Sequence, residues 1–328
     1  MEWLFPWRIC AQLRKRGVLG MNERNHAYIG RYNNRALYPL VDNKLVGKQL
    51  AIDAGIAVPQ LLHVVRTQHE AMSLRPWLEQ WSEFVIKPAK GSGGKGILVV
   101  TGRDGDRWLR VDGYPLSLDD IERHVSNTLG GLYSLGGNTD CAMIESLVQA
   151  DPVFESFSYG GVPDIRTVVF QGYPVMAMVR LTTARSGGKA NLHQGAVGVG
   201  LDLAHGTALS AVQMDHPISS HPDTGNAFAN LQVPGWSRVL ELSASCFEMT
   251  GLGYIGVDIV LDRERGPLIL ELNARPGLAI QIANNRGLLP RLRHVEALGS
   301  LHSRPQERVD YVRSTFTAAA EGAEALTR

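Results

Sequence analysis

The sequence contains few cysteines and no long apolar run. Its three cysteines, Cys10, Cys141 and Cys246, are widely spaced and form no CxxC pair, which argues against a disulfide framework and a zinc site. Free thiols are typical of the reducing cytoplasm, which is the location that we expect. No stretch approaches the length of a membrane-spanning helix. Residues 1–17 carry their basic side chains after a short apolar patch, the reverse of a signal peptide.

The chain also lacks an excess of either charge. Lys and Arg number 33 and Asp and Glu number 32, a formal net charge of +1, so the composition gives no basic footprint for nucleic acid. A chain of 328 residues that is 44% hydrophobic and 20% charged is typical of a globular protein with two or more subdomains. The composition therefore does not favour nucleic acid as a partner.

The densest chemistry lies in residues 251–278, GLGYIGVDIVLDRERGPLILELNARPGL. Alternation in GVDIVLD and PLILELNA predicts two strands joined by a turn at RERG. Side chains on a strand repeat every two residues, so Glu271 and Asn273 share a face, and a simple register brings Asp258 close to it. Two carboxylates and an amide oxygen suit Mg²⁺ or Mn²⁺. A solvated hairpin face is the alternative, although unpaired charges in such apolar runs would be costly.

A glycine-rich loop separates two predicted strands in residues 83–100, EFVIKPAKGSGGKGILVV. GSGGKG fits the loose dinucleotide fingerprint, but ILVV follows where a Rossmann or Walker A motif requires a helix. We interpret the segment as a β-hairpin flap whose backbone amides close over phosphates. Lys87, at the end of the first strand, is placed to reach the same phosphates.

Two further segments suit a nucleotide. Asp42 is the predicted N-cap of a helix that ends at Gly55. Lys44 in its first turn would add a cation to a helix N-terminus that meets a phosphate; a solvated lysine is the alternative. CAMIESLVQAD predicts a strand joining two lobes, where a base would lie against Glu145 and the backbone near Leu147.

Two arginines are embedded in apolar strands. Arg166 lies in DIRTVVF and Arg180 in YPVMAMVRL, and these runs predict a hairpin of buried strands. Each guanidinium needs an anion, which would be a substrate carboxylate, a transferring phosphoryl group or a structural Asp. Residues 182–195 then suit a lid that orders on ligand binding, and residues 201–234 predict an irregular insertion.

Together, DNKLVGKQLA, VIKPAKGSGGKG, DIR with a later NLHQG, GVDI and LELNARPG occur in an order that resembles ATP-grasp carboxylate–amine ligases, over about residues 42–298. The sequence is most similar to RimK-type α-L-glutamate ligases and, within them, to the sugar-transfer-associated branch. The resemblance implies an α+β ATP-grasp fold of two lobes gripping ATP, with a shortened N-terminal region. The implied divisions are a 1–41 arm, a 42–145 central subdomain with the flap, a 146–300 subdomain with the metal site, and a 301–328 tail.

The resemblance also implies the site. The nucleotide would contact Lys44, Lys87, Gly91, Ser92, Gly93, Gly94, Gly96, Glu145, Ser146 and Leu147. Asp258, Glu271 and Asn273 match magnesium ligands for two ions, with Mn²⁺ as an alternative. Arg166, Arg180, Asn191 and His193 match positions that line the reacting groups. Arg275 stands where RimK enzymes tend to have a small residue, and we expect it to hold a substrate carboxylate next to the metals.

The implied reaction transfers the γ-phosphoryl group of ATP to a carboxylate, and an amine then attacks the acyl phosphate. The product is an amide, and the substrates would be an amino acid such as glutamate or a small peptide. A phosphotransferase with the same site and a non-catalytic ATP-binding partner protein remain alternatives. Residues 1–16, with Trp3, Trp7 and several basic side chains, suit a partner protein, a membrane surface or packing on the chain's own domain. A homo-oligomer is left open.

Overall fold

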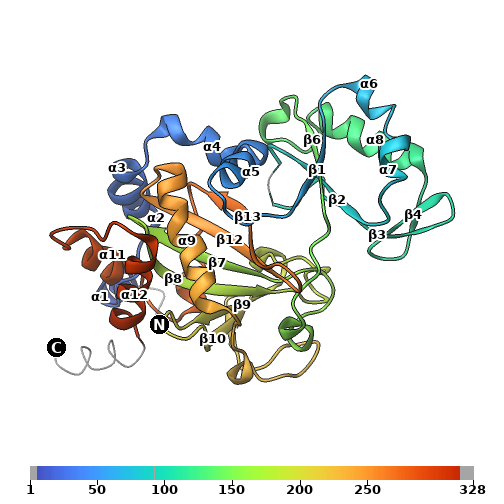
Figure 1. Ribbon diagram of the computed structural model, residues 1–328. Coiled ribbons are helices and arrows are strands. Elements are labelled where there is room, and N and C mark those ends of the chain that lie inside the picture. Colours follow the sequence, from blue (N-terminus) through green and yellow to red (C-terminus); the bar gives the residue numbers. More distant parts are fainter. Residues whose placement is uncertain (1–5, 92, 318–328) are drawn as a thin grey trace.

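Two antiparallel sheets form the frame of the protein in the computed structural model, which describes residues 6–91 and 93–317 (Figure 1). The smaller sheet has six strands in the order β1-β6-β2-β3-β4-β5, and the larger has seven in the order β11-β10-β9-β8-β7-β12-β13. Each sheet has its own apolar core. This arrangement confirms the predicted α+β class and the predicted pair of lobes.

The smaller lobe packs three helices near its sheet. Its longest helix, α8, begins at a capping box between Ser117 and Asp120. Ile121 and Val125, one turn apart on this helix, are fully buried against the sheet core. The elements are β1 (Leu61–Val65), α6 (Gln68–Ala71), α7 (Arg75–Leu78), β2 (Phe84–Pro88), β3 (Leu98–Asp104), β4 (Arg107–Arg110), β5 (Pro115–Leu116), α8 (Leu118–Leu129), η4 (Leu135–Gly137) and β6 (Ala142–Glu145).

The larger lobe is built on the two strands that contain the embedded arginines. Residues Asp164–Phe170 of β7 are all buried, which confirms the predicted hairpin with β8. Its turn uses Gln171 and Gly172, both with positive φ. The elements are η5 (Pro152–Phe157), β7 (Asp164–Phe170), β8 (Tyr173–Leu181), η6 (Leu192–Gln194), β9 (Val197–Leu201), β10 (Ala208–Gln213), β11 (His216–Ile218), η7 (Phe228–Asn230), α9 (Trp236–Thr250), β12 (Tyr254–Asp262), β13 (Gly266–Asn273), α10 (Ile280–Ala283), α11 (Leu289–Glu296) and α12 (Pro305–Thr315).

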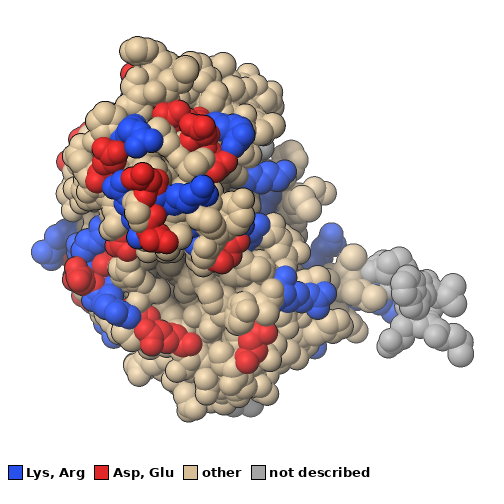
Figure 2. Space-filling view, turned by 90° about the vertical axis from the view of Figure 1, so that its right-hand side faces the viewer, with Lys and Arg blue, Asp and Glu red and all other residues tan. Residues whose placement is uncertain are grey.

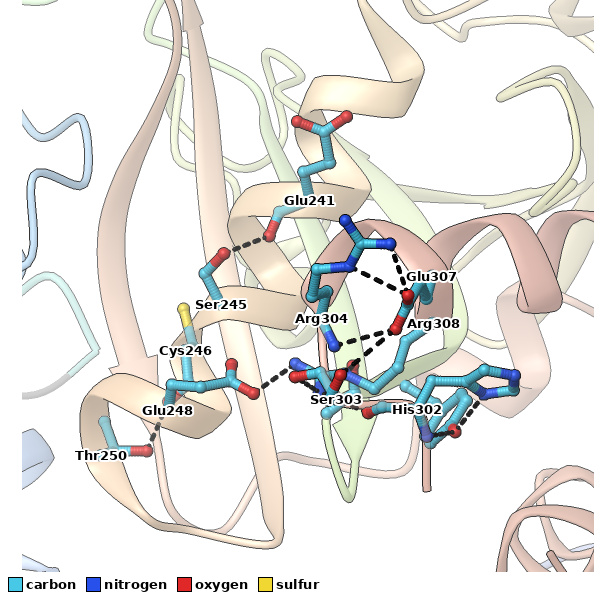
Figure 3. Close-up of polar contacts among 12 residues, drawn as sticks. Glu241, Ser245, Cys246, Glu248, Thr250, His302, Ser303, Arg304, Glu307 and Arg308 are labelled. Atoms are coloured by element: carbon cyan, nitrogen blue, oxygen red, sulfur yellow. Dashed lines mark hydrogen bonds and ion pairs between the residues drawn. The ribbon is translucent and has the colours of Figure 1, made fainter. Parts of the chain in front are cut away.

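Helix α12 corrects the expectation that residues 301–328 form a loose tail. It packs on α9 and β8 and buries Val309 and Val312 completely. Arg308 is 2% exposed, and Figure 3 shows its guanidinium directed at Glu248 on α9. It also donates to the Gly172 carbonyl at 3.0 Å. Residues 318–328 lie outside the described residues.

The N-terminal segment is part of the larger lobe, so the 1–41 arm was also predicted wrongly from residue 17 onward. Residues Met21–Tyr32 are helical, with a π-helical turn at Arg24–Ile29. Tyr28 is buried and its ring meets Phe170 edge-on at 5.5 Å. The segment also contains α1 (Pro6–Lys15), α2 (Met21–Glu23), η2 (Arg24–Ile29), α3 (Gly30–Tyr32), η3 (Arg35–Leu37), α4 (Pro39–Asp42) and α5 (Lys44–Asp53).

Other boundaries differ in detail. The side chain of Asn43, not that of Asp42, caps α5 by accepting from the backbone N–H groups of its first turn. Residues 279–301 form two short helices, because Asn285 takes a positive φ between them. Residues 201–234 add β10 and β11 to the edge of the larger sheet and are therefore not wholly irregular.

The surface of the described residues carries charges of both signs. Figure 2 shows acidic and basic side chains interspersed over the face on the side of the smaller lobe. Within residues 6–91 and 93–317, no helix is long and apolar enough to cross a membrane.

Candidate active site

Helix α5 lies where the two lobes meet. The Lys44 backbone N–H donates to the Ala89 carbonyl of the smaller lobe at 2.8 Å. The same helix packs against β13 of the larger lobe. A cavity of about 30 Å³ lies between them, lined by Val41, Lys44, Gly47, Lys48, Ala51, Val58, Ile269, Leu270, Glu271 and Leu272. Three of these lining residues, Lys44, Lys48 and Glu271, carry charge, so the lining of the cavity is partly polar.

The Lys44 side chain joins the glycine-rich loop to the predicted metal hairpin. Its ammonium donates to the Gly91 carbonyl at 2.7 Å and to Oε1 of Glu271 at 2.9 Å. The Lys44 side chain is 19% exposed and that of Glu271 is 34% exposed. The ammonium of Lys44 is therefore accessible to solvent while its contacts hold it between the two lobes.

Glu145 is the centre of a second cluster, at the end of β6. Lys87 on β2 donates to Oε2 at 2.6 Å, and Lys48 on α5 lies 3.1 Å from Oε1. Burial alone would raise the pKa of Glu145, but the two ammonium groups outweigh it and hold the pKa below its usual range. Burial lowers the pKa of Lys48, an effect that Glu145 opposes.

Both oxygens of Glu145 are engaged by lysines in this structure, and its expected contact with a nucleotide base stays a prediction. Lys87 is held by Glu145, and its side chain is 13% exposed. A phosphate that attracted Lys87 would have to compete with Glu145.

The embedded arginines form a buried chain with two aspartates. Arg166 makes a bidentate contact with Asp258, through Nε and through Nη2 at 2.6 Å. Arg180 donates to Asp164 through Nε at 2.5 Å and through Nη2 at 2.6 Å. Its Nη2 also donates to Asp258 Oδ2 at 2.9 Å. The structural alternative for both arginines therefore holds in this structure: each has an aspartate partner within the protein.

The side-chain pKa values of Asp164 and Asp258 are shifted in opposite directions. Burial would raise the pKa of Asp258, but Arg166 and Arg180 together keep it below its ordinary value. Burial raises the pKa of Asp164 to about 6, because Arg180 opposes it only in part and Asp258 adds repulsion. The carboxylate of Asp258 is therefore the more firmly ionised of the pair.

The hairpin register brings the predicted metal ligands together. Asp258 on β12 is paired with Glu271 on β13, and Gly256 with Asn273. The register shifts directly after Asp258, where Ile259 is paired with Ile269, as happens at a β-bulge. Among the described residues no three His, Cys, Asp or Glu side chains are grouped as metal ligands. The set of two carboxylates and one amide nevertheless has the hard-oxygen chemistry of a Mg²⁺ site, and its charges are neutralised here by Lys44 and the two arginines.

The glycine-rich loop connects β2 and β3, whose antiparallel pairing confirms the predicted hairpin. Gly93, Gly94 and Gly96 all have positive φ, and Ser92 lies outside the described residues. A Cβ at Gly96 would lie 2.4 Å from the Tyr133 ring. His124 approaches the Gly96 carbonyl at 3.0 Å. The loop is thus packed against the smaller lobe.

The remaining predicted residues make contacts of their own within the chain. Asn191 caps a short 3₁₀ turn by accepting from the backbone of His193, whose side chain is exposed. Ser146 accepts from Gln60 and Arg265, and Leu147 follows in the connection between lobes. Arg275 pairs with Asp42 at 3.2 Å and lies over the Tyr38 ring; its expected role with a substrate carboxylate stays a prediction.

Two charged residues of the site were missed by sequence reasoning. Lys48 follows Lys44 by four positions, the spacing that places two side chains on one helix face. Asp164 precedes Arg166 by two positions on one strand face. Both periodicities were visible in the sequence, but neither identifies the partner.

Comparison with known families gives one match. The family model described as sugar-transfer associated ATP-grasp matches residues 23–297. This range contains both sheets and every residue of the candidate site. No curated protein matches the chain significantly.

Solved structures with related folds are distant. The ATP-grasp ligase PsnB, complexed with a phosphomimetic variant of its minimal precursor, Mg and ADP, is 17% identical, with a TM-score of 0.44 over 81% of this chain and 60% of that chain. D-alanyl-alanine synthetase A from Vibrio cholerae O1 biovar eltor str. N16961 is 10% identical, with a TM-score of 0.42 over 85% and 66%. D-cycloserine synthetase DcsG is 18% identical, with a TM-score of 0.46 over 85% and 73%. The chain thus spans less than two thirds of the first of these proteins.

Proposed function

The chain belongs to the sugar-transfer-associated ATP-grasp family, and on this premise we propose that it is an ATP-dependent, ADP-forming carboxylate–amine ligase. The proposed substrates are an amino acid such as glutamate, or a small peptide, and an amine. The proposal treats residues 42–145 and 146–300 as the two ATP-grasp subdomains, with Met21–Tyr32 and α12 completing the second.

The observation that carries the proposal is the position of Lys44. Its ammonium lies 2.7 Å from the loop carbonyl of Gly91 and 2.9 Å from the Glu271 carboxylate. Phosphoryl transfer requires positive charge between a phosphate-binding loop and the groups that hold the departing phosphates. In the proposed complex Lys44 orients those phosphates, and Lys87 becomes a second cation as it exchanges Glu145 for phosphate.

Asp258, Glu271 and Asn273 are the proposed ligands of Mg²⁺. When bound, Mg²⁺ supplies charge neutralisation for the phosphate oxygens. Occupation of these oxygens would leave Arg166 and Arg180 with fewer anionic contacts at Asp258. In this proposal the two guanidinium groups then turn toward the reacting carboxylate and acyl phosphate, for which a fixed planar donor pair is suited.

The reaction is written in two steps. The substrate carboxylate oxygen bonds to the γ-phosphorus of ATP as the bond to the bridging oxygen breaks, giving an acyl phosphate and ADP. The amine nitrogen then bonds to the acyl carbon, phosphate leaves and the nitrogen loses a proton. The chain supplies positioning and charge, so no protein nucleophile is needed. Asn191 and His193, on the loop next to β9, are proposed to line the acceptor side.

The test is ADP release from ATP and Mg²⁺ across a panel of amino acids and dipeptides, with hydroxylamine as a trap. We expect hydroxamate with one carboxylate, and neither hydroxamate nor ADP above background with Asp258→Asn. The variant keeps the shape of the side chain and removes its charge. Folding of the variant is checked by its thermal transition.

Two outcomes would count against a ligase. Phosphate transfer to a stable acceptor, without hydroxamate, would identify a phosphotransferase with the same site. ATP binding without turnover across the panel would favour the non-catalytic alternative. In either case the family assignment would stand, because it rests on the match over residues 23–297.

A further inference from the structure

Helix α1 (Pro6–Lys15) is followed by a segment that is hydrogen-bonded to the larger lobe. Every side chain that the structure describes from residue 8 to residue 16 is exposed. The chain is then fixed at Gly17, whose carbonyl accepts from Leu289 at 3.0 Å. Leu19 is fixed in turn, because its N–H donates to Gln281 at 2.8 Å and its carbonyl accepts from the same side chain at 3.1 Å. The described side chains of residues 8–16 are therefore exposed next to a segment that is fixed by hydrogen bonds.

This helix has apolar side chains that the described part of the chain leaves uncovered. Ile9 is 53% exposed and Leu13 is 43% exposed. They lie four positions apart and so share one face, and Cys10 lies on the same side at about 100° per residue. A helix of 10 residues is marginal in water without tertiary packing. A partner that covers Ile9 and Leu13 would stabilise it.

The charge around this apolar stripe is of one sign. Arg8, Arg14, Lys15 and Arg16 are all basic, and residues 6–16 contain no Asp or Glu. On the helical wheel Arg14 borders one edge of the stripe, and Arg16, in the turn directly after the helix, continues the other edge. Cations on both borders of a narrow apolar face are typical of a helix that lies in the interface of an anionic bilayer. The surface in Figure 2, by contrast, mixes both signs.

We propose that α1 docks this protein on an anionic lipid surface, with Ile9 and Leu13 inserted among the headgroups and the basic side chains against lipid phosphates. Figure 1 shows α1 beside the larger lobe, at the end of the molecule away from the smaller lobe. Docking through α1 therefore leaves the junction of the lobes open to substrates. The proposal is independent of the reaction that the protein catalyses.

The test is cosedimentation of the full chain with vesicles of phosphatidylcholine alone and of phosphatidylcholine with a quarter phosphatidylglycerol. We expect binding to the anionic vesicles only, weakened at high salt because bulk ions screen the charges. Arg14→Gln/Lys15→Gln/Arg16→Gln should reduce the bound fraction at least tenfold. Ile9→Gln/Leu13→Gln should do the same at low salt, although its charge is unchanged.

Matched controls separate this site from general surface properties. Val111→Gln/Leu132→Gln removes two exposed apolar side chains elsewhere (60% and 67% exposed), and Arg107→Gln/Arg238→Gln/Arg263→Gln removes three exposed cations. Both should bind vesicles as the wild type does. The proposal is overturned if the wild type does not bind anionic vesicles, or if the α1 variants bind equally well. Failure to bind vesicles together with a change in oligomeric state in Ile9→Gln/Leu13→Gln would assign the face to a protein partner instead.

Discussion

Asp258 on β12 lies directly opposite Glu271 on β13, yet each carboxylate is neutralised by cations from a different direction. Arg166 and Arg180 hold Asp258 from within the larger sheet, and Lys44 holds Glu271 from the helix at the lobe junction. Cations from two strands and one helix therefore meet at one pair of acids. The following experiments test cations and acids of the site and other features of the fold.

Lys44→Met should lower kcat/KM for ATP about a hundredfold or more, because the variant keeps the length of the side chain and loses the charge that stabilises transferring phosphate. Steady-state ADP release measures the effect. Gln49→Met, on the exposed side of the same helix, is the control and should retain wild-type kinetics. Equal kinetics in the two variants would remove Lys44 from the phosphate site.

Lys48→Met should destabilise the fold by about 3 kcal/mol, since loss of one partner leaves buried Glu145 with an uncompensated oxygen. Urea unfolding followed by circular dichroism gives the free energy of unfolding. Lys48→Met/Glu145→Gln should cost less than the sum of the two single variants. Additive effects would indicate that the contact contributes little.

Arg166→Gln should bind Mn²⁺ about tenfold more tightly than the wild type when nucleotide is absent, because the guanidinium and the ion compete for Asp258. Isothermal titration or electron paramagnetic resonance measures the dissociation constant. Arg263→Gln removes an exposed arginine that pairs with Glu155 and controls for net charge. An unchanged or weaker affinity in Arg166→Gln would contradict competition at Asp258.

Acid should weaken the contacts that Asp262 makes with Arg265 and with the backbone of Glu264 and Gln149. Burial alone would raise its pKa, but Arg265 and the backbone N–H groups of Arg265, Glu264 and Gln149 lower it to about 2, from an ordinary 3.8. The unfolded chain therefore binds the proton first, so the contribution to stability is complete above about pH 5 and is lost as the pH falls through about 2.

Urea unfolding at a series of acidic pH values tests this effect. Asp262→Asn cannot titrate at this position and should lose less stability than the wild type between about pH 5 and pH 2. Parallel loss in the two proteins would show that Asp262 does not contribute to the acid response.

Two glycines of the loop offer a matched pair. Gly94→Ala should cost about 1 kcal/mol from positive φ alone, since nothing lies within 4 Å of its added Cβ. Gly96→Ala adds a clash at 2.4 Å with the Tyr133 ring and should cost more. Differential scanning calorimetry of both variants measures the difference. Gly96→Ala/Tyr133→Ala should recover part of the additional loss; no recovery would mean that the ring does not press on the loop.

The local parts of this fold were readable from the sequence because their causes are local. Alternation of apolar and polar residues predicted the β12–β13 hairpin, and apolar runs predicted β7 and β8. Helix α12 was not predicted, because only a few of its side chains are buried in the core. So few buried positions give no clear helical period in the sequence. Tyr28 of the π-helical turn at Arg24–Ile29 packs against Phe170, a long-range contact that the local sequence pattern does not contain.

The sequence indicated which residues belong to the site more readily than it indicated their interaction partners. Arg166 and Asp258 are 92 residues apart in sequence, and only the sheet order places β7 beside β12. The need of Arg166 for an anion followed from burial, but the choice between a substrate and Asp258 did not. Glu145 likewise stood out as an acid in an apolar strand, while its two lysines come from β2 and α5.

The two contacts of Lys44 constrain how the lobes can separate. Its backbone N–H is bonded to Ala89 in the smaller lobe, and its ammonium is bonded to Glu271 in the larger one. If the lobes move apart at this point, one of these bonds must break. An open form that keeps the backbone bond carries its lysine away with the glycine-rich loop, so the positive charge leaves the acids and returns only on closure.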